Sequence, residues 1–115
     1  MQSKAECKWL RMSPRKVRRV INEIRGVTAG EAFTTLRFMQ FAAAREVEKV
    51  LKSALFNLIN NGKTTVSEKQ AQELRIVEVY ANQGPTLSRR RPRARGTAYP
   101  ILKRSTHITV VLADV

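Results

Sequence analysis

Residues 89–96 read Arg-Arg-Arg-Pro-Arg-Ala-Arg-Gly, which places five arginines within eight positions. The guanidinium group is planar, keeps its charge near neutral pH, pairs with phosphate oxygens through its N–H donors and stacks on nucleobases. Segments rich in β-branched and aromatic residues flank this run, at residues 74–81 and 106–112. We therefore expect the run at the tip of a long hairpin, with nucleic acid as its partner.

A second concentration of positive charge lies near the N-terminus. Residues 11–25 carry six basic residues against the single acid Glu23, and residues 84–104 carry seven basic residues and no acid. These two segments hold nearly all of the net charge of +13, whereas residues 26–83 are almost balanced. The sequence thus predicts two basic surfaces on a neutral scaffold. The candidate nucleic-acid-binding residues are Arg11, Ser13, Arg15, Lys16, Arg18, Arg19, Arg25, Arg89, Arg90, Arg91, Arg93, Arg95, Lys103 and Arg104.

Helical spacing places the N-terminal basic residues on one element. A helix is expected from Ser13, its N-cap, to a stop at Gly26. The apolar stripe consists of Val17, Val20, Ile21 and Ile24. The basic side chains lie around it, with Arg15 and Arg19 opposite the stripe, Arg18 and Arg25 on one flank and Lys16 on the other. Because the first turn holds two cations where the helix dipole disfavours them, we expect a phosphate to bind there.

The remaining patterns predict an α+β fold, in which three helices pack on a small antiparallel sheet and a long β-hairpin arm extends from the sheet. The expected strands are residues 4–10, 74–81 and 106–112, a second helix starts at Thr28, a third ends at Asn60, and residues 63–73 are polar and turn-like. We expect one domain over residues 1–115, with a body of residues 1–83 and 105–115 and an arm of residues 84–104 that reaches about 30 Å. The inward-facing residues of the second helix are expected to be Ala32, Phe33, Leu36 and Met39. The aromatic residues expected mainly in the core are Trp9, Phe33, Phe38, Phe41 and Phe56, which leaves Tyr99 on the arm as the candidate for base stacking.

The composition also argues against other classes of protein. With one cysteine and one histidine, neither a disulfide nor a metal cluster is expected, and no cofactor. His107 has no nucleophile or paired acid nearby in sequence, so we expect no enzyme. No apolar run is long enough to span a membrane, which favours a soluble chain. The alternatives are a DNA-binding regulator, disfavoured because the exposed face of the third helix is not basic, and then an enzyme acting on RNA.

Several motifs together resemble one family, the bacterial-type large-subunit ribosomal proteins numbered twenty-two. Their order and spacing, over nearly the whole chain, carry the resemblance. The motifs are Met12-Ser13-Pro14-Arg15-Lys16-Val17-Arg18, Ile24-Arg25-Gly26, Lys49-Val50-Leu51-Lys52-Ser53-Ala54, Gly84-Pro85-Thr86-Leu87, Arg91-Pro92-Arg93-Ala94-Arg95-Gly96 and His107-Ile108-Thr109-Val110.

The resemblance implies a structural constituent of the large ribosomal subunit that binds and scaffolds its 23S-type rRNA. It also implies contacts with neighbouring ribosomal proteins and with the nascent peptide, but not with DNA or a membrane, and a place in cytoplasmic ribosomes or, alternatively, organellar ones. The arm departs from the family pattern at Ser88, Arg90 and Thr97. The tip residues that the resemblance places in the peptide exit tunnel are Arg89, Arg90, Arg91, Pro92, Arg93, Ala94 and Arg95.

Overall fold

Three long helices form where the apolar residues recur at helical spacing, in a computed structural model that describes residues 2–60 and 67–114. They are α1 (Pro14–Ile24), α2 (Ala29–Phe38) and α3 (Ala42–Ile59). Ser13 is the N-cap of α1, and the Thr28 hydroxyl accepts a hydrogen bond from the backbone N–H of Glu31 at the start of α2. All three predicted helices are therefore confirmed.

Three strands form the sheet of the body, in the order β1-β5-β2. They are β1 (Gln2–Leu10), β2 (Arg75–Gln83) and β5 (Thr106–Ala113). The central strand β5 pairs antiparallel with both neighbours, and its buried run of β-branched and aliphatic residues suits that position. The predicted pairing of residues 74–81 with 106–112 is confirmed.

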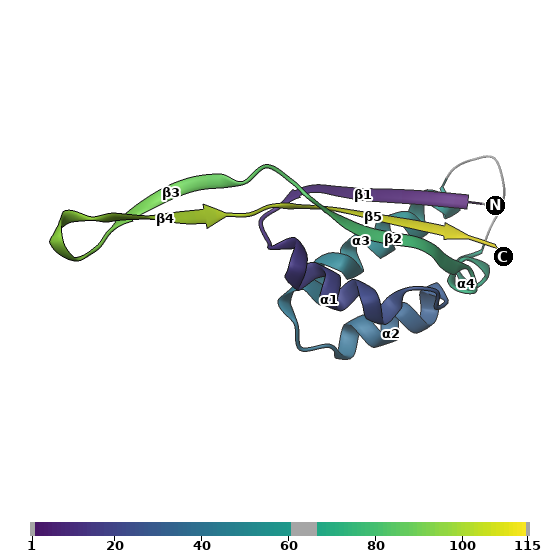
Figure 1. The fold of residues 1–115 in the computed structure, drawn as a ribbon. Helices are drawn as coiled ribbons and strands as arrows, with labels where there is room; N and C mark the ends of the chain where they lie inside the picture. The colour runs from purple at the N-terminus through teal and green to yellow at the C-terminus, as the bar shows by residue number, and fades with distance from the viewer. Residues whose placement is uncertain (1, 61–66, 115) are drawn as a thin grey trace.

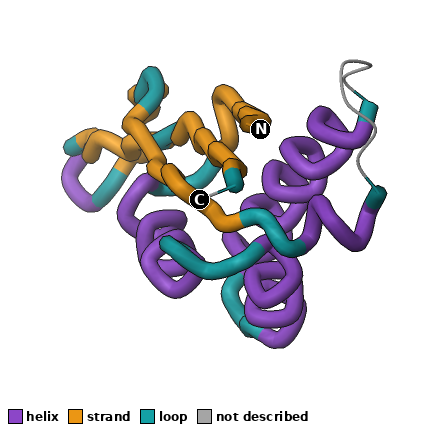
Figure 2. The backbone as a smooth tube through the Cα atoms, turned by 90° about the vertical axis from the view of Figure 1, so that its right-hand side faces the viewer, coloured by secondary structure: helices purple, strands orange, loops and turns teal. Residues whose placement is uncertain are grey.

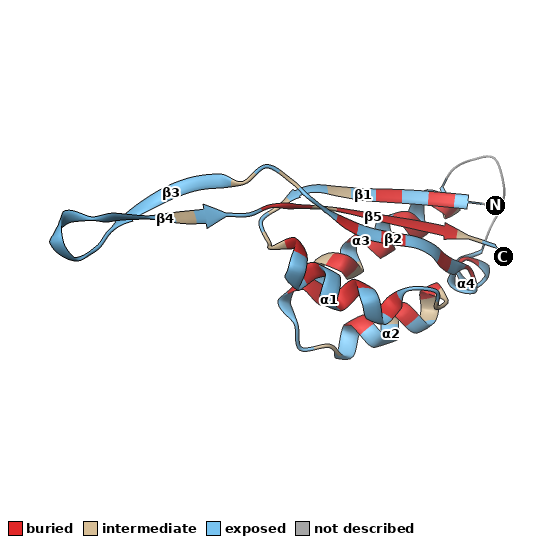
Figure 3. Cartoon of the chain, viewed as in Figure 1, coloured by how far each residue is buried: buried red, intermediate tan, exposed pale blue. Residues whose placement is uncertain are grey.

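The hydrophobic core lies between the helices and one face of this sheet (Figures 1 and 2). Helices α1 and α3 press their apolar stripes against the sheet, and α2 packs against α3. In Figure 3 the buried residues lie along the inner faces of the helices and along β5. The largest fully buried side chains are Ile21, Ile24, Leu36, Leu51, Leu58, Ile76, Ile108 and Leu112.

The arm protrudes from the body as a separate two-stranded sheet of β3 (Leu87–Pro92) and β4 (Ala98–Lys103). A turn of 3-10 helix, η1 (Ala94–Gly96), joins them, with Arg95 and Gly96 in the left-handed backbone region. The molecule measures 65 × 27 × 17 Å, and its radius of gyration of 17.3 Å exceeds the roughly 13 Å of a compact domain of this length. Residues 87–100 are all exposed, so the arm contributes nothing to the core (Figure 3).

The prediction of a polar turn over residues 63–73 is wrong in its second half, where α4 (Glu68–Gln72) forms. Ser67 begins α4 with a reciprocal capping box, in which its hydroxyl accepts from the N–H of Gln70 and the Gln70 side chain accepts from the N–H of Ser67. Ala71 is the buried residue of this helix. Residues 63–66 lie outside the described part of the chain.

The prediction that the aromatic residues lie mainly in the core is also wrong. Phe38 is 78% exposed and Trp9 is 65% exposed, and Phe41 and Phe56 are exposed as well. Phe33 packs only partly against the core, as does Met39, whereas Ala32 and Leu36 are buried as expected. Trp9 leaves the inner face because a β-bulge interrupts β1 between Cys7 and Leu10.

Candidate nucleic-acid interface

The first turn of α1 has the properties expected of an anion site. Ser13 caps the helix without a side-chain hydrogen bond, and within the described residues the first turn carries no acid. Arg15 and Lys16 are both exposed there. The partial positive charge of a helix N-terminus adds to these two cations, so an anion is favoured at this end.

Two of the predicted basic residues are engaged with the protein itself. The Arg18 guanidinium donates two hydrogen bonds to the Ala81 carbonyl, from Nε at 3.1 Å and Nη2 at 2.9 Å. Arg25 donates from Nη2 to the Val79 carbonyl at 2.9 Å. Both carbonyls belong to β2, an edge strand whose outer side has no neighbouring strand within the described sheet. These arginines therefore attach α1 to the edge of the sheet. They can reach β2 because they lie on α1 beside the apolar stripe that packs on the sheet.

A basic groove joins the two charged segments of the sequence. The start of α1, the connection from α2 to α3 and the end of β4 line an open cavity of about 790 Å³. Among the described residues that line it, none is acidic. We use the term basic groove for this cavity. Its polar and charged lining residues are Arg11, Ser13, Lys16, Arg19, Gln40, Lys103 and Arg104.

The far wall of the basic groove is the start of α3. Phe41 is the N-cap of that helix and makes no side-chain cap hydrogen bond, and within the described residues its first turn carries no acid. The Arg19 guanidinium carbon lies 3.8 Å from the centroid of the Phe41 ring, a cation–π contact that fixes the charge at the groove. Sequence reasoning missed Phe41 because it placed this residue in the core.

On the arm, the arginines project from both faces of the hairpin. Arg89 pairs with Ile101 and Arg91 with Tyr99, so these two share one face, while Arg90 opposite Pro100 lies on the other. Arg93 precedes the turn, where its guanidinium carbon lies 5.4 Å from the Tyr99 ring centroid. The side-chain ion pairs between described residues lie elsewhere, on β1 and α3. The arm therefore presents exposed arginines on both of its faces.

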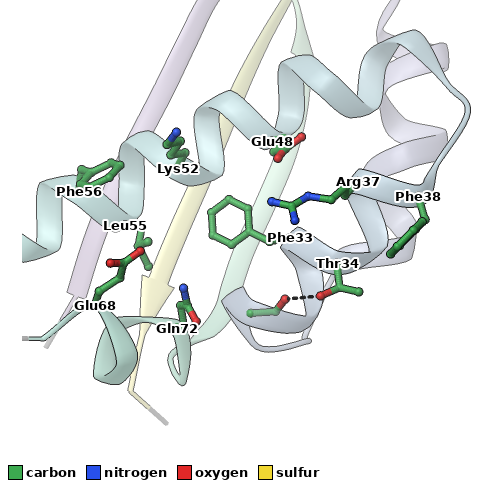
Figure 4. A pocket seen from close by; sticks show the side chains of 11 residues that line it. Phe33, Thr34, Arg37, Phe38, Glu48, Lys52, Leu55, Phe56, Glu68 and Gln72 are labelled. Carbon is green, nitrogen blue, oxygen red and sulfur yellow. Dashed lines mark hydrogen bonds between the residues drawn. The ribbon is translucent and has the colours of Figure 1, made fainter.

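A second cavity, of about 410 Å³, lies between α2, α3 and α4 (Figure 4). Arg37 and Lys52 line it together with Glu48 and Glu68, so both signs of charge are present. Phe33, Phe38 and Phe56 add apolar surface around these charges. Because its lining carries both signs of charge, this cavity lacks the concentrated positive charge that makes the basic groove attractive to a polyanion.

His107 makes a structural contact, and the described residues contain no metal-binding cluster. The ring of His107 accepts a hydrogen bond at Nδ1 from the backbone N–H of Trp9, 3.0 Å away, as expected for an ordinary hydrogen-bonded histidine. Residues 2–60 and 67–114 contain no cluster of side chains that would hold a metal ion. Their helices include none that is both long enough and apolar enough to cross a membrane.

Comparisons with known proteins place the chain in a family. Residues 5–113 match the family described as ribosomal protein L22p/L17e. The large ribosomal subunit protein uL22 of Clostridium novyi (strain NT) is 48% identical over 114 residues, covering 99% of this chain and 98% of that protein. Its namesake in Synechococcus sp. (strain JA-3-3Ab) is 48% identical over 112 residues, covering 97% and 87%. That of Staphylococcus haemolyticus (strain JCSC1435) is 46% identical over 114 residues, covering 99% and 93%. The resemblance carried by the sequence motifs is thereby confirmed, and the chain belongs to the ribosomal protein L22p/L17e family.

Proposed function

We propose that this ribosomal protein scaffolds the rRNA of the large subunit through the basic groove and the exposed face of α1, and that its arm lines the peptide exit tunnel. It is a structural component and not an enzyme, in keeping with its family. Its partners are large-subunit rRNA, neighbouring ribosomal proteins and, at the tip of the arm, the nascent peptide. It acts in the ribosomes of the cytoplasm.

The observation that carries the proposal is the basic groove. It gathers Arg11 and Lys16, from the start of the chain, and Lys103 and Arg104, from the end of the arm, around one cavity without an acid among its described lining residues. Like charges are costly to bring together unless a polyanion neutralises them, and the RNA backbone supplies one phosphate per nucleotide. Two helix N-termini lie at the same groove, and the partial positive charge of each adds to that of the cations.

The residues of α1 divide into two roles within this proposal. Arg15, Lys16 and Arg19 are exposed and contact phosphates directly. Arg18 and Arg25 are hydrogen-bonded to the edge of the sheet. A guanidinium has five N–H donors, however, and the hydrogen bonds to β2 use two donors of Arg18 and one of Arg25. Their remaining donors keep both residues in the proposed RNA-binding set.

The proposal for the arm rests on its shape and composition together with the family resemblance. A hairpin that is exposed over residues 87–100 has no core to hold it, and a two-stranded sheet alone is marginal in water. RNA would stabilise such a hairpin, because its phosphates and bases pair with and stack on the five arginines. An arm that extends well beyond the body and lies within RNA has the shape needed to form part of the wall of the exit tunnel.

A salt titration tests the RNA-binding part of the proposal. The double variant Arg15→Glu/Arg19→Glu is compared with Lys52→Glu/Lys69→Glu, which makes the same charge change outside the basic groove. Each lost phosphate contact weakens binding to a large-subunit rRNA transcript and flattens the log–log salt slope by about 0.7 to 0.9. Equal affinities and slopes for the two double variants contradict the proposed interface.

A further inference from the structure

Trp9 occupies a strained position at the root of the arm. The register of β1 against β5 passes from Cys7 opposite Ile108 to Leu10 opposite Thr106, so two residues of β1 face His107 alone. Within this β-bulge Trp9 has φ 59°, in the left-handed region that bulky side chains rarely adopt. A bulge of this kind redirects a side chain, and strain of this kind persists only where the surroundings impose it.

The neighbours of Trp9 fix this conformation. Its backbone N–H donates to Nδ1 of His107 at 3.0 Å, and the two rings meet edge to face with centroids 5.7 Å apart. On its other side the His107 ring lies against Gly84, where a Cβ atom would come within 3.1 Å of Cε1 and Nε2. The imidazole therefore lies between Gly84 and Trp9, and its contacts with the Trp9 backbone and ring fix the position of the indole. Trp9 nevertheless remains 65% exposed.

The surroundings of the exposed indole are polar. Lys8 precedes it, Asn82 lies opposite His107 in the register of β2, and both are exposed. Two residues further along the chain, Arg11 lines the basic groove. In a protein interface of high affinity, the aromatic anchors are surrounded by further contacts that exclude water. A nucleobase, in contrast, has apolar faces for stacking and polar edges for hydrogen bonds. An exposed ring with polar neighbours, such as Trp9, suits a nucleobase better.

We propose that Trp9 is a stacking platform for an unpaired base of the rRNA segment that lies in the basic groove. This inference rests on the proposed rRNA binding and assigns one residue within it. The indole face supplies the stacking surface, and Arg11 binds a phosphate on one side of the stacked nucleotide. Lys8, whose ammonium lies 4.0 Å from a carboxylate oxygen of Glu6, exchanges that partner for the phosphate on the other side. Single-stranded RNA is recognised in this way, because unstacked bases can be inserted against aromatic side chains.

Fluorescence provides a direct test, since Trp9 is the only tryptophan of the chain. The full-length protein is titrated with a transcript of large-subunit rRNA while tryptophan emission and its quenching by acrylamide are recorded, and affinity is measured in parallel by filter binding. We expect the transcript to quench the emission and to shield the indole from acrylamide. Trp9→Asn, which suits the left-handed backbone but removes the ring, should weaken binding by between about 5-fold and 150-fold, the range of base–aromatic stacking.

Two further variants separate stacking from general damage. Trp9→Phe keeps a ring and should bind within a few-fold of the parent. Phe38→Ala removes an even more exposed ring, on the face of mixed charge formed by α2, α3 and α4, and should bind like the parent. If the parent binds with the expected salt slope while its indole stays open to acrylamide, the stacking role is overturned and the proposed function stands. If the indole is shielded only in assembled subunits, a neighbouring protein covers it and the assignment to RNA is wrong. Absence of any binding to the transcript overturns both.

Discussion

Arg15 and Arg18 lie three residues apart on the same helix, and replacing each by alanine should affect the folding of the body differently. Arg15 is exposed at the first turn of α1, whereas Arg18 donates two hydrogen bonds to the Ala81 carbonyl of β2. Arg15→Ala should therefore weaken RNA binding and leave folding unchanged. Arg18→Ala should lower the stability of the body, because it detaches α1 from the edge of the sheet.

The size of the Arg18 effect follows from its contacts. Hydrogen bonds to a charged group contribute about 1.5–3 kcal/mol, and water can replace part of that here because the side chain is exposed. A loss of about 1 kcal/mol is the reasonable expectation. At an unfolding entropy of about 2.1 cal/mol/K per residue, a chain of 115 residues then melts about 4 °C lower.

Calorimetric melts of the two variants, with filter binding to the rRNA transcript, test this division of roles. Arg25→Ala serves as an independent check, because its single hydrogen bond to Val79 predicts a smaller shift than that of Arg18→Ala. The reasoning is refuted if Arg15→Ala lowers the melting temperature as much as Arg18→Ala. It is refuted equally if Arg18→Ala melts like the parent.

Other predictions follow from the core, the arm and the sheet. Leu58→Ala, at a fully buried position of α3, should cost about 2–5 kcal/mol of stability. An unchanged melting temperature would show that α3 does not bury this face in the core. Deleting residues 89–95 and closing the strands with a tight turn should leave the melt unchanged but alter the response of reconstituted subunits to tunnel-binding drugs; an unaltered response would remove the arm from the tunnel. The hydrogen bond from Lys4 holds the pKa of Glu6 below its ordinary value. The pair therefore stabilises the fold fully above about pH 4.3, the ordinary pKa of glutamate, and this stability is lost as the pH falls through the lowered pKa of Glu6. Lys4→Gln should therefore flatten the acid side of the stability profile, and a profile identical to that of the parent would show that the pair contributes nothing.

Elements with a strong period could be predicted from the sequence. The stripes of α1 and α3 and the β-branched runs of β2 and β5 each carry enough apolar residues to fix both the type of element and the face that it buries. Helix α4 escaped prediction because it has five residues and one buried side chain, Ala71, so it shows no period. Its capping box, from Ser67 to Gln70, was the available signal.

The candidate site could be predicted only in part. The charge pattern located both halves of the basic groove, but their meeting depends on the end of β4 lying beside the start of α1, which no local pattern encodes. The bulge that exposes Trp9 is a property of strand pairing and leaves the alternation of residues 4–10 looking regular. Similarly, Arg18 and Arg15 differ in role because only one of them faces a free strand edge.

Crosslinking within assembled large subunits, with each crosslink mapped to a residue and a nucleotide, tests the central proposal most directly. RNA crosslinks are predicted at the lining of the basic groove, at the exposed face of α1 and along residues 89–95, with nucleotides shared between Lys16 and Lys103 because both line the same cavity. The face formed by α2, α3 and α4, with its mixed charges, should give few. Crosslinks concentrated on that face, with the groove and the arm unreacted, would contradict the proposal.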